Sequence, residues 1–461
     1  MTPTAVSRST EGGTFVPPTV VAPVRPLSRL AFAARFVRNP LLVMPRAAYE
    51  EDFVASSQGR LSFAWITEPS LIRAVLLDQR DAFRKLTQIR LLSPLLGKGI
   101  LTSEGADWKW QRQASAPMFR IQDLAGFVPT FVRATRDLVE GWRASCADAV
   151  RQVDRDMTRV TFDVISATLL PSGDRTVAPA IERSTGRFQS AGAWSQLYAM
   201  ARAPRWLPHP GVRAMRESVR TLRSAVAAMI RERRAGAAAP DDLMNRLMQA
   251  SDPETGQSMN DEQLVDNLLT FYLAGHETTA RALTWTLYLL SHSPAWTARL
   301  EEEIARVTGG GDVEAAHVDR LVLVQQVVKE SMRLYPPVPM LSRQAVADTR
   351  IGEHDIRAGT SVVVPIYAIH RHRRRWEDAD RFDPERFAPA REAVIPRYQY
   401  VPFGAGPRIC IGMAFAMIEA TAILATLLQH ARFSSAGHEP APVARVTLLP
   451  RGGMPLQVRL R

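Results

Sequence analysis

The chain has 461 residues, of which 46% are hydrophobic and 23% charged, so a fibrous or globally disordered protein is excluded. The formal net charge is +12, but the arginines are scattered and no nucleic-acid reader motif accompanies them, which disfavours a nucleic-acid-binding protein. The two cysteines, Cys146 and Cys410, are too few for a disulfide framework and favour a reducing, cytoplasmic setting.

Residues 1–26 are rich in Pro, Thr and Val without periodicity, and we expect them to form a loose leader. They lack both the charged start and the apolar core of a signal peptide. No stretch supplies the roughly 18 consecutive apolar residues of a membrane-spanning helix. Residues 27–38 mix basic and apolar side chains, so they either pack on their own domain or contact a membrane surface.

The remaining pattern predicts one mainly helical domain, residues 27–461, with a smaller β region. Helical spacing dominates from 27 to about 335, and the part from 336 to 461 is richer in strands and loops. In that second part we expect a hairpin at 350–359, a strand at 361–366 and a helix at 411–428. A second hairpin is expected to pair 444–449 with 456–460.

Three helical segments carry polar residues at informative spacings. Four residues separate Trp108 from Arg112, which places both on one side of a helix, although a plain amphipathic helix would show the same spacing. In residues 271–280 a glycine, an acid and two threonines predict a local break in an apolar helix; a buried polar patch is the alternative. Glu330 and Arg333 share a helix face, as an exposed ion pair would.

The densest basic run is HRHRRR, residues 370–375. A solvated loop is the simplest interpretation of this run. The functional alternative is a docking surface for an acidic partner protein.

The most informative segment is FGAGPRICIG, residues 403–412. Its three glycines let the backbone approach a flat porphyrin closely. They are Gly404, Gly406 and Gly412. The helix expected after Cys410 offers N–H groups and a positive dipole end to a thiolate. Phe403 offers the sulfur an apolar shield, and Arg408 offers a cation to a haem propionate. The alternative, a buried structural cysteine in a glycine-rich turn, does not explain why all these features coincide.

This segment is similar to the haem-binding signature F-x-x-G-x-R-x-C-x-G of the cytochrome P-450 family, and every diagnostic position matches. The resemblance implies the cytochrome P-450 fold, with haem b held between an oxygen-activating helix and the helix after the cysteine loop. It makes Cys410 the axial ligand of the iron, and such a thiolate favours O–O cleavage.

Other motifs of the family follow in the same order along the chain. Glu330, Arg333 and Arg386 match its E-x-x-R and P-E-R-F motifs, which implies a buried charged cluster that braces the core. Residues 274–278 match A-G-x-[DE]-T, which implies that Thr278 hydrogen-bonds dioxygen and that Glu277 belongs to a proton relay. The positions at which the family contacts haem correspond to Trp108, Arg112, Phe403, Gly404, Arg408 and Gly412, and also to Arg343, for which the nearby Arg350 and Arg357 are alternatives.

The resemblance implies a monooxygenase that inserts one oxygen atom from O2 into a C–H or C=C bond of an apolar substrate. Electrons are expected to come from NAD(P)H through a separate ferredoxin or flavodoxin and its reductase, because no reductase domain follows Arg461. A haem-thiolate isomerase or dehydratase and a non-catalytic haem sensor or carrier are the alternatives. The Glu277–Thr278 pair argues against both, because neither needs a proton relay. We expect a cytoplasmic monomer.

The resemblance also places the substrate pocket, and its apolar character favours a lipid, terpenoid, steroid or carotenoid. The expected lining residues are Val338, Met340, Leu341, Phe271, Ala274, the loop 91–101 and the region 185–210 with Trp194, Tyr198 and Trp206.

Overall fold

The computed structural model describes residues 4–5, 8–9, 15–169, 194–201, 203–204, 207–236, 242–252 and 254–461. The α-helices are α1 (Arg29–Arg38), α2 (Pro69–Arg73), α3 (Leu86–Leu96), α4 (Gly105–Ser115), α5 (Ile121–Leu124), α6 (Val128–Ser145), α7 (Val153–Leu169), α9 (Val212–Ala235), α10 (Leu243–Gln249), α11 (Asp261–Ser291), α12 (Pro294–Thr308), α13 (Ala315–Val318), α14 (Val322–Leu334), α15 (Ile366–Ile369), α16 (Pro389–Glu392) and α17 (Met413–His430). A further helical stretch covers 194–200.

The strands form small sheets rather than one large layer. They are β1 (Thr4–Ala5), β2 (Arg8–Ser9), β3 (Phe15–Val16), β4 (Thr19–Val20), β5 (Phe53–Gln58), β6 (Leu61–Ile66), β7 (Phe83–Arg84), β8 (Asp148–Gln152), β9 (Leu341–Ala345), β10 (Thr349–Ile351), β11 (His354–Ile356), β12 (Ser361–Val364), β13 (Ala431–Ser435), β14 (Ala441–Ala444), β15 (Leu448–Arg451) and β16 (Pro455–Leu460). The predicted class, mainly helical with a smaller β part, is confirmed.

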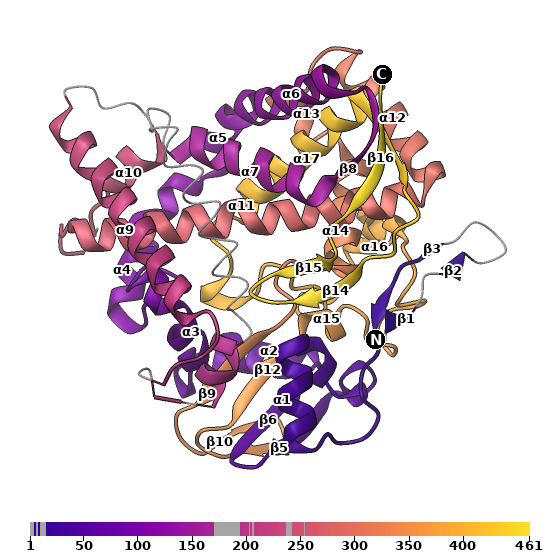
Figure 1. Ribbon diagram of the computed structural model, residues 1–461. Coiled ribbons are helices and arrows are strands. Elements are labelled where there is room, and N and C mark those ends of the chain that lie inside the picture. The colour runs from indigo at the N-terminus through magenta and orange to yellow at the C-terminus, as the bar shows by residue number, and fades with distance from the viewer. Residues whose placement is uncertain are drawn as a thin grey trace.

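Helix α11 crosses the middle of the helical part, and the largest sheet lies below it (Figure 1). The helix begins with a capping box, in which Asn260 and Gln263 satisfy each other's backbone N–H groups. Helices α7, α9, α14 and α17 pack around it, so most of its side chains are buried. A helix that is surrounded in this way is a rigid platform for any residue it carries.

The largest sheet joins the early strands β5, β6 and β7 to the much later strands β9 and β12, in the order β5-β6-β12-β9-β7. Strand β12 runs parallel to β6, with Ser361 opposite Phe63, and antiparallel to β9, with Val362 opposite Arg343. Strands β5 to β7 therefore lie inside the part that was expected to be helical. The predicted boundary near residue 335, between a helix-rich part and a strand-rich part, is too sharp. Strands from both sides of this boundary share one sheet.

Residues 15–20 of the N-terminal segment pack on the rest of the protein. Phe15 and Val20 are buried, and the Phe15 ring stacks on His292 with 4.6 Å between ring centroids. The Tyr335 hydroxyl donates to the carbonyl of Pro18 at 2.8 Å. The expected loose leader is therefore wrong for residues 15–20, because their apolar side chains and backbone carbonyls find partners on the core.

The hairpin expected at 350–359 is present as β10 and β11, and the helix expected at 411–428 is α17. The second predicted hairpin is wrong. The turn at Gly452 and Gly453 exists, but β15 before it pairs with β14, whereas β16 after it pairs with β13 and β8. Helix α17 is long and apolar enough to cross a membrane, yet 61% of it is buried inside the protein.

Candidate active site

A cavity of about 450 Å³ lies between α11, the cysteine loop and the largest sheet, and most of its lining is apolar. Fifteen of the residues singled out from the sequence line it. They are Trp108, Arg112, Phe271, Ala274, Glu277, Thr278, Val338, Met340, Leu341, Arg343, Phe403, Gly404, Arg408, Cys410 and Gly412. The fold thus brings four distant segments of the chain to one space.

The distal wall of the cavity agrees with the predicted substrate pocket in part. Six apolar residues of the expected loop line it, namely Leu91, Leu92, Leu95, Leu96, Ile100 and Leu101. In the described part of 185–210 the lining residue is Gln196, whereas Trp194 and Tyr198 of the same helical stretch do not line the cavity. Tyr198 instead donates its hydroxyl to the carbonyl of Pro208 at 3.3 Å. Trp206 lies outside the described residues.

The cysteine loop is a tight turn that ends at α17. The backbone N–H of Cys410 donates to the carbonyl of Phe403 at 3.0 Å, which closes the loop. Gly406 has a φ of +70°, and a Cβ there would lie 2.1 Å from the carbonyl oxygen of Leu76. The sequence predicts that this glycine admits a porphyrin, whereas in the structure the backbone of Leu76 is what excludes a side chain at Gly406.

The Cys410 thiol is accessible from the cavity but enclosed by protein. Burial raises its pKa, while the backbone N–H of Gly412 and the nearby Arg112 oppose that rise. Arg112 also donates to the carbonyl of Ile409 at 3.0 Å, so it braces the loop from the side. The predicted backbone donor to the sulfur is therefore present as the N–H group of Gly412, whereas the nearby cation, Arg112, was predicted at a haem propionate instead.

Buried cations surround the same end of the cavity. The Arg408 guanidinium lies 4.0 Å from the centre of the Trp108 ring and donates to the carbonyl of Ser103 at 2.9 Å. Burial lowers the pKa of Arg408 and of Arg343 to about 10. Glu104 is the acid whose charge opposes this shift at both arginines.

A further buried cation, Lys85, was missed by the sequence analysis. Its ammonium donates to the carbonyl of Leu101 at 2.6 Å, and its side chain lines the cavity. Burial, and then the charges of Arg408 and Arg343, lower its pKa to about 7. No motif marks this lysine; its position becomes clear only when β7 brings it beside the arginines.

These features fit a haem. Cys410 presents one thiol to the cavity, as an axial ligand of a haem iron does. Several buried cations against a single carboxylate leave excess positive charge, which a dianion such as the two propionates of haem would neutralise. An apolar space lies beyond them.

The sequence predicts a local break in residues 271–280, but this part of α11 is not broken. The helix is continuous from Asp261 to Ser291, and the Thr278 hydroxyl donates to the carbonyl of Ala274 at 2.6 Å. This bond within the helix satisfies a hydroxyl that would otherwise compete with the helix. Ala274 and Thr278 line the cavity, and the helix between them is not interrupted.

The Glu277 carboxylate is buried, with 7% of the residue exposed, and it points to a different part of the chain. Its Oε1 accepts a hydrogen bond from the hydroxyl of Thr447, in the turn between β14 and β15, at 2.5 Å. Arg281 Nε lies 4.0 Å from the same oxygen. The acid is thus held by a partner 170 residues away that the sequence did not reveal.

A second buried acid, Glu419 on α17, was also missed. It is fully enclosed, the Thr279 side chain hydrogen-bonds it, and burial raises its pKa to about 8. Its signal in the sequence is a lone acid in the apolar helix Met413–His430. It lies beside the motif residues of α11 but does not line the cavity.

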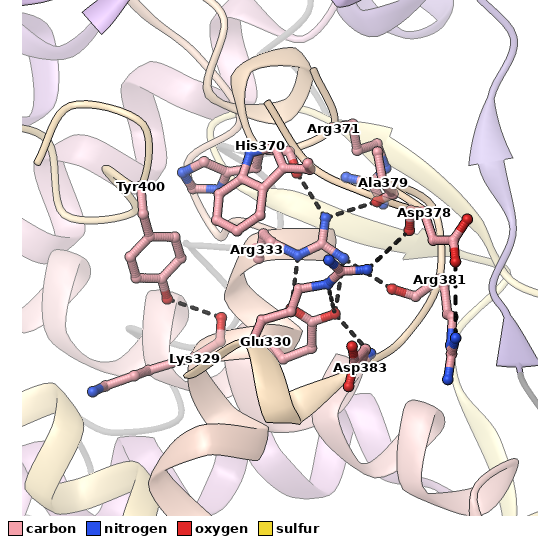
Figure 2. Close-up of polar contacts among 12 residues, drawn as sticks. Lys329, Glu330, Arg333, His370, Arg371, Asp378, Ala379, Arg381, Asp383 and Tyr400 are labelled. Atoms are coloured by element: carbon pink, nitrogen blue, oxygen red, sulfur yellow. Dashed lines mark hydrogen bonds and ion pairs between the residues drawn. The ribbon is translucent and has the colours of Figure 1, made fainter. Parts of the chain in front are cut away.

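The charged cluster, drawn in Figure 2, has no member among the residues that line the cavity. Arg333 and Glu330 are both completely buried, and Arg333 donates from Nε to Glu330 Oε2 at 2.6 Å and from Nη2 to Oε1 at 2.8 Å. Arg333 also donates to the carbonyls of His370, Ala379 and Arg381. Arg386 Nε lies 3.6 Å from Glu330 Oε1. The three predicted members therefore meet in the core.

The basic run 370–375 is not a solvated loop. His370, Arg371 and His372 are buried, and Arg371 packs 4.0 Å from the centre of the Tyr367 ring. Arg375 forms an ion pair with Asp52. Half of the run therefore belongs to the core, because the segment that follows α15 passes between the charged cluster and the N-terminal part of the chain.

Comparisons with known proteins agree with this geometry. The family model described as cytochrome P450 matches residues 39–455. A protein of Glycyrrhiza uralensis named 11-oxo-beta-amyrin 30-oxidase is 32% identical over 86% of this chain and 80% of its own length. A cytokinin hydroxylase of Arabidopsis thaliana is 32% identical over 84% of this chain and 77% of its own. The cyclooctat-9-en-7-ol 5-monooxygenase of Streptomyces melanosporofaciens is 31% identical over 85% and 84%.

Proposed function

Because the chain belongs to the cytochrome P450 family and is a monooxygenase of that family, we propose that it hydroxylates or epoxidises an apolar substrate at the cavity beside Cys410. The observation that carries this proposal is that one largely apolar cavity is lined by both Cys410 and Thr278. In the overall reaction the substrate, O2, NAD(P)H and one proton give the oxygenated product, water and NAD(P)+. One oxygen atom enters the substrate and the other leaves as water.

Several residues would hold the haem. The Cys410 thiolate would bind the iron, and Arg112, Arg343, Arg408 and Lys85 would neutralise the propionates, with Trp108 packed against Arg408. When bound, the haem activates dioxygen, and a thiolate ligand favours O–O cleavage. The apolar side chains of the distal wall would exclude bulk water from the space above it.

The protons of the reaction would be handled by α11. The Thr278 hydroxyl faces the cavity and, while it donates to Ala274, its oxygen can accept a further hydrogen bond. The Glu277 carboxylate lies one residue away and can hold a proton within reach of the same space. An isomerase or a haem carrier would not need a positioned acid and hydroxyl. This pair therefore favours the oxygenase over both alternatives.

The finer details are inferred from chemistry. The apolar lining fits a lipid, terpenoid, steroid or carotenoid, and relatives named for 11-oxo-beta-amyrin and cyclooctat-9-en-7-ol support the terpenoid choice. Besides Cys410 only Cys146 remains, and one cysteine cannot hold an iron–sulfur cluster, so a separate ferredoxin or flavodoxin would deliver the electrons. Both cysteines are free, in keeping with a cytoplasmic protein, and we propose a monomer.

The experiment begins with the purified holoprotein and a spectral-shift screen against apolar compounds. Hits are then turned over under isotopically labelled O2 with NAD(P)H, in parallel with a ferredoxin system and a flavodoxin system. The expected result is a product that carries one labelled oxygen atom. A product without label, or one that forms without NAD(P)H, would contradict the proposal.

The ligand is tested in the same preparation. The ferrous carbon monoxide complex should show the strongly red-shifted band of thiolate ligation, and Cys410→Ala should lose it. Cys146→Ser is the matched control, because Cys146 is exposed and does not line the cavity. If Cys410→Ala kept the band, Cys410 would not be the ligand.

A further inference from the structure

We propose that Thr447 is a positioning residue for Glu277 and that it couples the substrate-lining turn between β14 and β15 to proton delivery. The proposal rests on the role given to Glu277 in the proposed function. Both residues line the cavity, and both are buried, with 3% and 7% of each residue exposed. The chain supplies them from a strand-to-strand turn and from the middle of α11.

The contact is a hydrogen bond to a charged acceptor. The Thr447 hydroxyl donates to Glu277 Oε1 at 2.5 Å, whereas Arg281 Nε, at 4.0 Å, is too far for a hydrogen bond to that oxygen. Hydrogen bonds to carboxylates are about twice as strong as neutral ones, and more so where water is excluded. Thr447 therefore holds Oε1 of the carboxylate toward the β14–β15 turn.

The turn that carries Thr447 is itself fixed from both sides. The Asn39 side chain accepts from the N–H of Ala444 at 3.0 Å and donates to the carbonyl of Pro442 at 3.0 Å. On the other strand, the Trp285 indole N–H of α11 donates to the carbonyl of Leu448 at 3.0 Å. Asn39 and Trp285 are buried, so these bonds hold the turn against α11.

The same turn borders the substrate space. Ala444, Arg445, Val446 and Thr447 all line the cavity. The N–H of Arg445 donates to the carbonyl of Thr447 at 2.9 Å, which closes the turn. A β-branched side chain has few accessible rotamers, so a movement of the turn moves the Thr447 hydroxyl with it. A substrate that presses on Val446 therefore acts on the orientation of Glu277.

The experiment compares Thr447→Val with Thr447→Ser in the holoenzyme. Valine keeps the shape and removes the donor, whereas serine keeps the donor. We expect Thr447→Val to bind haem and substrate, to form about tenfold less product per NAD(P)H and to release more peroxide. Thr447→Ser should restore coupling. Should the valine variant fail to bind haem, Thr447→Ala serves in its place.

A control and a reference separate this proposal from the one it rests on. Thr286→Val removes another buried hydroxyl of α11, which donates to the carbonyl of Ala282 at 2.7 Å and does not line the cavity; it should stay coupled. If Glu277→Gln stays fully coupled, the role of Glu277 fails. If Glu277→Gln uncouples and Thr447→Val does not, the positioning role of Thr447 alone is wrong.

A readout without turnover completes the test. In crystals of substrate-free Thr447→Val holoenzyme, the Glu277 carboxylate should leave the β14–β15 turn, because its donor there is gone. In Thr447→Ser it should stay. A carboxylate that keeps its position in the valine variant would overturn the proposal, since something other than the Thr447 hydroxyl would then orient it.

Discussion

The backbone N–H of Val401 donates to Nε2 of His370 at 2.9 Å, and this bond joins the buried charged cluster to the loop that carries Cys410. On one side, Arg333 donates to the carbonyl of His370 at 2.7 Å. On the other, the N–H of Gly404 donates to the carbonyl of Val401 at 3.0 Å. His370 therefore transmits the position of the cluster to the start of the cysteine loop.

We expect His370→Phe to keep the ring stacked on Tyr400 and to leave the Val401 N–H buried without an acceptor. The free energy of unfolding should fall by about 1–3 kcal/mol. Part of the ferrous carbon monoxide complex should lose the thiolate band, because the loop is less well held. An unchanged spectrum and an unchanged unfolding free energy would contradict the link.

The same substitution should change the pH dependence of stability. Burial, with the charge of Arg333, lowers the pKa of His370 from 6.5 to about 3 in the folded protein. The unfolded chain therefore binds a proton below pH 6.5 that the folded chain refuses. The wild type should lose about 1.4 kcal/mol of stability per pH unit from pH 6.5 down to about 3 through this group, and His370→Phe should lack that slope.

Arg333 is expected to matter for folding rather than for chemistry. Arg333→Ala leaves the Glu330 carboxylate buried without its main partner, which costs about 3–5 kcal/mol and should give insoluble or haem-free protein. Arg299→Ala is the matched control, because Arg299 and Glu385 form a half-exposed pair at 2.7 Å that should be worth less than about 1 kcal/mol. A haem-replete Arg333→Ala with normal turnover would show that the cluster is dispensable.

Glu419 should make the protein less stable as the pH rises. Burial raises its pKa from 4.5 to about 8, so the unfolded chain releases a proton between these values that the folded chain keeps. The stabilisation is present below pH 4.5 and is lost as the pH rises through about 8. When unfolding is measured from about pH 4 to about pH 9, Glu419→Gln should not show this loss of stability. Parallel curves for variant and wild type would exclude a neutral Glu419.

Lys85 should contribute to haem retention. Burial disfavours the charged ammonium and lowers the pKa of Lys85 to about 7. A haem propionate nearby would give this charge a partner. Lys85→Met should release haem to apomyoglobin about tenfold faster, whereas Lys85→Arg keeps the charge and should stay near the wild-type rate. Equal rates for all three proteins would mean that Lys85 only supports the Leu101 backbone.

The motifs predicted the fold class and fifteen of the residues that line the cavity, because local spacing is enough to identify the cysteine loop and the α11 segment. They could not predict partners that come from remote segments. The contact of Thr447 with Glu277 and that of His370 with Val401 depend on tertiary packing alone. The error at β15 and β16 has the same cause, since turn residues predict a turn but not which sheet each strand joins.

Thr278 gives the sharpest test of the chemistry. Its hydroxyl donates to the carbonyl of Ala274 within α11, so removing it costs the helix little and leaves the cavity intact. Thr278→Ala should therefore still bind haem, substrate and carbon monoxide. Thr278→Ser, which keeps a hydroxyl at the same place, is the matched control.

What should change in Thr278→Ala is the fate of the electrons. NAD(P)H is still consumed, but two electrons and two protons convert O2 to hydrogen peroxide instead of giving product and water. Loss of a positioned proton-transfer group is worth about a hundredfold in the affected step, so product per NAD(P)H should fall steeply. The measurement compares product with peroxide for each NAD(P)H consumed. A fully coupled Thr278→Ala would show that Glu277 or an ordered water delivers the proton without the Thr278 hydroxyl, since the cavity offers both acceptors and space for either route.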